Sequence, residues 1–246
     1  MVRALARLRR RQPRPQPRAP LPAEIEAIRQ QAEKGHTLEQ VLWGKILLNS
    51  VYVPSDPEAA RTWFTIAANA QYGPGHNMLG RCFHFGWGCR QDFQQAARCY
   101  ARAAELGDEW GRYNLGILTM RGLGVTQDLA TALACFRQAA HAGHAKSMNL
   151  YARFLEEGWT VPRDRQAALS WYRRSAEGGD YRGQHNYATF LLEAGKPDQA
   201  LHLWEQAVRT ATPDILQAMA RTLAGMDRPE AATLRETVET RLKAVL

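Results

Sequence analysis

The strongest constraint on the fold is an internal repeat with a period of 36 residues. Stepping along the chain by this interval returns the same residue type in many columns. Two columns persist through five copies, one of alanine and one of large apolar residues: Ala32, Ala68, Ala104, Ala140 and Ala176, and Ile28, Phe64, Tyr100, Phe136 and Tyr172. Units of this length bury their apolar faces only by stacking on one another, so the sequence predicts a stacked repeat array.

Each period is predicted to contain two helices. Apolar residues around Tyr100 recur at spacings of three and four, which places them on one stripe of a helix. Asp92 precedes this helix as a cap for its first amides, and Gly107 ends it. An earlier helix is predicted over 75–85, where the small Gly80 lets the partner helix approach closely.

The segment 110–143 carries the motifs of a known family. It contains Asn114-Leu115-Gly116, Gly122-x-Gly124, Asp128, Ala132, Phe136 and Ala139-Ala140-x-x-Gly143. This pattern resembles the Sel1-like repeat, a relative of the tetratricopeptide repeat. The resemblance covers about 20–195 and implies an all-α fold, a right-handed α-solenoid of stacked antiparallel helix pairs. Residues 196–246 are predicted to end the stack as degenerate tetratricopeptide-like helices, over 198–210, 213–224 and 228–246.

The same resemblance implies a non-enzymatic scaffold or adaptor that binds a protein or peptide on its concave surface. The sequence holds no nucleophile motif and no phosphate-binding loop. Its four cysteines lack zinc-site spacing, and His141 and His144 straddle a predicted helix end. We therefore predict no enzyme, no cofactor and no metal. No apolar stretch is long enough to span a membrane.

The basic charge is concentrated at the N-terminus. The net charge is +8, but residues 1–20 hold seven arginines and no acid, whereas the remainder has 25 bases and 24 acids. Prolines follow the arginines, so we predict a disordered tail over 1–19; Val2, Leu5 and Leu8 leave a short basic amphipathic helix as the alternative. A tail of this kind predicts weak nonspecific binding to polyanions, and the alternative function is a nucleic-acid-associated protein that uses it. No secretory signal is recognisable, which favours the cytoplasm.

Concave residues follow from helix geometry. Positions three before, one after and four after the Gly80 column point away from the partner helix. The binding candidates at these offsets are Lys45, Asn77, Arg81, Tyr113, Asn149, Arg153 and His185, and the same offsets also give His84, Thr189 and one acid, Glu156. Trp110, Lys146 and Arg182 are predicted at the rim one turn earlier. This basic, amide-rich set predicts an acidic or carboxylate-ended peptide ligand, with Arg81 and Arg153 as charge partners and Asn77 and Asn149 as donors. The alternative is a solvated face with scattered charges.

A second candidate surface is a ridge of turn residues that includes Trp87 and Trp159. Exposed tryptophans often anchor protein partners. The alternative, which we favour, is that these side chains fold over a neighbouring repeat.

Overall fold

In the computed structural model, residues 20–245 form thirteen helices and no strand. The predictions made for residues 1–19 and for Leu246 lie outside this described range. In chain order the helices are α1 (Ala23–Glu33), α2 (Thr37–Asn49), α3 (Pro57–Asn69), α4 (Gly73–Phe85), α5 (Phe93–Glu105), α6 (Glu109–Arg121), α7 (Leu129–His141), α8 (Ala145–Glu157), α9 (Arg165–Glu177), α10 (Tyr181–Glu193), α11 (Pro197–Ala207), α12 (Pro213–Ala224) and α13 (Pro229–Val245).

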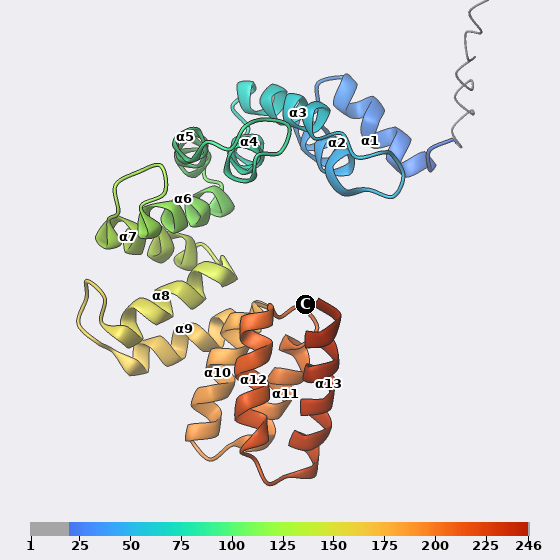
Figure 1. Cartoon of the computed structure of the whole chain (residues 1–246). Coiled ribbons are helices and arrows are strands. Elements are labelled where there is room, and N and C mark those ends of the chain that lie inside the picture. Colours follow the sequence, from blue (N-terminus) through green and yellow to red (C-terminus); the bar gives the residue numbers. More distant parts are fainter. Residues whose placement is uncertain (1–19, 246) are drawn as a thin grey trace, which may run out of the picture.

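The helices stack into a curved array. Consecutive helices pack against each other from α1 to α11, and α12 packs on α13, which also contacts α11. In addition, α2, α4, α8 and α10 each contact the next even-numbered helix. From α2 to α8 the even-numbered helices line the inner side of an arc, with the odd-numbered helices outside (Figure 1). This arrangement confirms the predicted all-α repeat solenoid. None of the helices within 20–245 has the length and apolar character required to cross a bilayer.

Aspartates start the second helix of four repeats, as predicted. One carboxylate oxygen of Asp92 accepts hydrogen bonds from the backbone N–H groups of Gln94 and Gln95, at 2.9 and 3.0 Å. Equivalent caps start α3, α7 and α9, through Asp56, Asp128 and Asp164. Two aspartates that the sequence analysis did not single out, Asp108 and Asp180, cap α6 and α10 on the inner side. Each cap is typically worth about 1 kcal/mol.

Close packing within each pair explains the glycine column. A Cβ atom added at Gly80 would lie 2.7 Å from the ring of Tyr100, and one added at Gly116 would lie 2.7 Å from the ring of Phe136. Both aromatic rings are fully buried. The small residue is therefore required by the large residue opposite it, which confirms the predicted close approach.

The C-terminal helices form one apolar cluster with α10. Its centre is Trp204 on α11, which is fully buried, as is Tyr172 one unit earlier. The observed α11 ends at Ala207, slightly before the predicted 198–210, while α12 coincides with the predicted 213–224. The consecutive packing therefore continues through α11, which lies in the segment predicted to end the stack.

Candidate functional site

The largest concentration of polar side chains on the inner face surrounds a cavity of about 520 Å³. We call this cavity the groove. Residues of α6, α8 and α10 line it, together with the start of α12. Five of the predicted site residues lie here: Tyr113, Lys146, Asn149, Arg153 and Arg182. The structure thus brings together half of the predicted site.

The groove carries charges of both signs, which corrects the expectation of a basic surface. Four bases and four acids line it: Arg121, Lys146, Arg153, Arg182, Glu156, Glu157, Asp180 and Asp214. Within the described part of the chain, none of these eight groups forms an ion pair with another residue. Ion pairs do form elsewhere on the surface, as between Arg228 and Asp198 at 2.7 Å. The charges of the groove are therefore available to a ligand.

The two predicted donor asparagines make a contact through their side-chain oxygens that the sequence did not predict. Asn77 and Asn149 are buried, and each accepts a hydrogen bond from an asparagine 37 residues later. The Nδ2 group of Asn114 donates to Asn77 at 2.9 Å, and that of Asn186 donates to Asn149 at 2.8 Å. We call these two contacts the amide bridges. Since each bridge joins adjacent inner helices, a main role of these asparagines is to hold the stack together.

One acid of the groove is fixed by a buried tyrosine. The hydroxyl of Tyr172 donates a hydrogen bond of 2.7 Å to Glu156. Burial raises the pKa of Tyr172, and the hydrogen bond to Glu156 raises it further. Tyr172 therefore remains a donor at neutral pH and holds the carboxylate of Glu156 at the wall of the groove.

Asp180 is the most buried acid of the groove, with 5% of its surface exposed. One oxygen accepts a hydrogen bond of 3.0 Å from the backbone of Gly183, which caps α10. The other oxygen, Oδ1, is buried and has no partner among the described residues. Burial raises the pKa of Asp180, although its cap bond and the nearby Lys146 and Arg182 oppose this shift.

The predicted rim is present beside the groove. A second cavity of about 520 Å³ is lined by Trp110, Lys146 and Asp180 among others, and the last two also line the groove. The indole of Trp110 is 47% exposed, and the Lys146 ammonium lies 5.2 Å from its ring centre. Arg182 stacks in a similar way on Tyr181, at 4.7 Å. These aromatic faces orient the two cations.

The two ridge tryptophans are half-buried and pack on neighbouring apolar clusters. Each also carries a predicted groove arginine on its face: Arg81 lies 5.0 Å from the Trp87 ring centre, and Arg153 lies 5.1 Å from that of Trp159. The two surfaces that the sequence treats as alternatives are therefore in contact. This geometry favours packing for the tryptophans.

Besides Asn77 and Trp110, three predicted site residues do not reach the groove. Arg81 belongs to α4, which lies before the part of the arc that α10 and α12 close. His185 accepts a hydrogen bond of 3.2 Å from the indole of Trp204, and burial lowers its pKa. Lys45 lines a separate cavity at the start of the stack.

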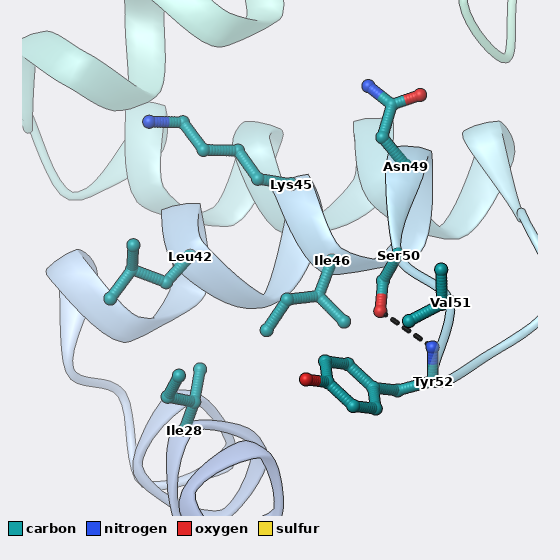
Figure 2. Close-up of a pocket in the computed structure, with 8 residues that line it drawn as sticks. All are labelled: Ile28, Leu42, Lys45, Ile46, Asn49, Ser50, Val51 and Tyr52. Atoms are coloured by element: carbon teal, nitrogen blue, oxygen red, sulfur yellow. Dashed lines mark hydrogen bonds between the residues drawn. The ribbon is translucent and has the colours of Figure 1, made fainter.

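That cavity, of about 400 Å³, is open because only α1, and no earlier inner helix, precedes α2 within 20–245. Figure 2 shows Ile28, Ile46 and Tyr52 facing one another, while the Lys45 amine points away from them. Ile46 corresponds to Cys82 in the next repeat, which is fully buried by its neighbours. The exposed apolar surface is therefore the end of the array.

Several groove residues were not predicted from the sequence. Arg121 and Glu157 lie five positions after the Gly80 column, beyond the three offsets that were used. Asp180 precedes α10 as its cap, and Asp214 lies past residue 195. A cap signal could have identified Asp180, because an aspartate precedes Gly183 by three residues. Within 20–245 there is no group of three His, Cys, Asp or Glu residues placed to hold a metal.

Comparison with known proteins places this architecture in a family. The profile of the Sel1 repeat matches residues 40–72, 73–108, 111–144, 145–180 and 182–209, which is more than half of the chain. The chain therefore belongs to the Sel1 repeat family. The fifth match runs past residue 195 and takes in both α10 and α11. No curated protein matches the chain.

Solved structures share the fold at low sequence identity. A Sel1 repeat protein from Oxalobacter formigenes superposes with a TM-score of 0.73 and 22% identity, over 88% of this chain and 99% of that one. A putative Sel1 repeat protein from Klebsiella pneumoniae gives 0.55 and 18%, over 80% and 98%. The immunity protein PA5088 from Pseudomonas aeruginosa gives 0.57 and 13%, over 92% and 83%.

Proposed function

We propose that this protein is a non-enzymatic cytoplasmic scaffold that binds a peptide segment of a protein partner in the groove. Sel1 repeats typically mediate protein interactions. The observation that carries the proposal is the groove itself, whose eight charged side chains form no ion pairs with described residues. Charged groups on a concave surface of this size supply both steering and specificity to a binding partner.

The partner segment is proposed to carry carboxylates. Lys146, Arg153 and Arg182 can each donate to a carboxylate, and guanidinium groups do so with two parallel hydrogen bonds. Nucleic acid is the less favourable ligand for the groove, because its four acids would repel phosphates. The chain contains no nucleophile or cofactor motif, which supports a binding role rather than catalysis.

Site-specific photocrosslinking in cells of the native host tests this proposal. A photoreactive amino acid replaces Met120, which lines the groove, or Gln138, which is exposed on the outer helix α7. We expect a discrete crosslinked protein from position 120, at least ~10-fold stronger than from position 138. Equal labelling at the two positions, or no product at position 120, would refute binding in the groove.

A further inference from the structure

The eight charged groups of the groove divide between two edges. The even-numbered helices run in the same direction, because an antiparallel helix separates each from the next. The N-terminal edge, at the starts of α8, α10 and α12, carries Lys146, Asp180, Arg182 and Asp214. The C-terminal edge, on α6 and α8, carries Arg121, Arg153, Glu156 and Glu157. Each edge therefore holds two bases and two acids.

Apolar and aromatic side chains also line the groove, and on α8 Leu150 lies between the two edges. The others are Tyr113, Ile117, Met120 and Ile215, and the amide bridge of Asn149 and Asn186 contributes to the same lining. Lys146 and Glu157 mark the two edges on α8, and the helical rise separates them by about 16 Å. An extended peptide covers this distance with about five residues. A ligand that spans the groove therefore presents an apolar residue between two charged ends.

At the N-terminal edge, a ligand must supply a hydrogen-bond donor to Asp180 as well as an acceptor for Lys146 and Arg182. Asp180 is almost completely buried, and its Oδ1 atom has no partner among residues 20–245. A buried acceptor without a donor is unfavourable, so a ligand that supplies an ammonium, guanidinium or amide N–H group gains a contact there. Since Asp180 lines both the groove and the rim cavity, a side chain can approach it from either side.

A ligand with charge of one sign cannot satisfy this pattern. Acidic side chains would meet Lys146 and Arg153 favourably but would also face Asp180, Glu156 and Glu157. Basic side chains would meet these acids favourably but would also face Lys146 and Arg153. Unfavourable placement of like charges is a principal means by which interfaces exclude the wrong partner.

We infer that the groove recognises a mixed-charge peptide segment, in which each end offers both an acidic and a basic side chain and an apolar residue lies between them. This inference rests on the proposed function and specifies the partner's chemistry. The charge order of the segment, rather than its net charge, then determines binding.

Selection from a random peptide library tests the inference. The immobilised full-length protein is panned against displayed 12-residue peptides. Enriched sequences should contain acidic and basic residues on both sides of an apolar residue, with the charged groups about five residues apart. Enrichment of peptides that are only acidic, only basic or uncharged would overturn the inference. So would a failure to enrich any sequence.

Arg153→Glu and Arg81→Glu form a matched pair for this selection. Each variant loses an arginine stacked on a tryptophan, but only Arg153 lines the groove. Peptides enriched on the unmodified protein should bind Arg153→Glu at least ~10-fold more weakly and Arg81→Glu unchanged. Renewed selection on Arg153→Glu should enrich peptides that carry one more base. An equal loss in both folded variants would contradict the assignment.

Failure of the inference is distinguishable from failure of the proposed function. If position 120 crosslinks to a partner whose bound segment has charge of one sign only, the scaffold function stands and the mixed-charge rule is wrong. If position 120 gives no crosslink, the proposed function itself fails.

Discussion

The unit of α4 and α5 and the unit of α8 and α9, two repeats apart, are built alike. Each has an amide bridge to the next inner helix, of 2.9 and 2.8 Å. Each has an arginine stacked on a turn tryptophan, at 5.0 and 5.1 Å. In each, a fully buried tyrosine fills the space opposite a small residue. All these shared contacts lie within the stack and hold its repeats together.

The two units differ in what the tyrosine hydroxyl meets. Tyr100 lies 3.3 Å from the Nδ1 atom of His84, whereas Tyr172 donates to the carboxylate of Glu156 at 2.7 Å. Only the second unit lines the groove, because α10 and α12 lie across from it. Residues that recur with the repeat therefore hold the stack together. Residues that differ between the two units, such as Glu156, place charge in the groove.

The largest expected loss of unfolding free energy is the same in the two units. Tyr100→Ala and Tyr172→Ala each remove a ring whose exposed fraction is at most 1%, and each should destabilise the protein by about 3–5 kcal/mol. Urea unfolding followed by circular dichroism measures the loss. A difference of more than about 2 kcal/mol between the variants would show that the units do not contribute equally to the stack.

Removal of the tyrosine hydroxyl alone should destabilise the protein by a different amount in each unit. Tyr172→Phe removes a hydrogen bond to a charged group, which is typically worth about 1.5–3 kcal/mol, whereas Tyr100→Phe removes a neutral one worth about 0.5–1.5 kcal/mol. Unfolding free energies at pH 7 provide the measurement. Equal losses would mean that solvent already satisfies Glu156 and that its bond to Tyr172 adds nothing specific to the groove.

The smallest expected effect is the pH dependence of stability that arises from His144, which precedes α8. Burial lowers the pKa of His144 to about 4, below its ordinary value of 6.5. Between these values the unfolded chain binds a proton that the folded chain does not, so acidification favours unfolding. We expect His144 to contribute a loss of about 1 kcal/mol between pH 7 and pH 5, a value reduced for partial exposure. His144→Asn should abolish this part of the dependence, whereas His36→Asn, at the equivalent position before α2, should not. Identical pH profiles for the two variants would contradict the assignment.

The sequence predicted those features that depend on contacts within one repeat. The Asp92 cap and the packing of Gly80 on Tyr100 recur every 36 residues and are visible as columns. The amide bridges of Asn77 and Asn149 were not predicted, because the partner of each lies 37 residues away in the next unit, one position out of register.

The charge balance of the groove could not be predicted in the same way. Its lining combines residues from five helices, and the curvature of the arc decides which of them face one cavity. Asp214 belongs to α12 and reaches the groove only through this curvature. Tertiary shape, rather than any local pattern, therefore determined which half of the predicted site came together.

The amide bridges also distinguish the joints between inner helices. They join α4 to α6 and α8 to α10, but at the joint between α6 and α8 the two equivalent positions hold Tyr113 and Leu150. These two side chains pack on one apolar cluster. A hydrogen bond resists sliding because it is directional, whereas apolar packing tolerates small shifts. The joint between α6 and α8, which the groove spans, therefore lacks the directional restraint of the joints on either side of it, and we expect it to be more compliant than those two.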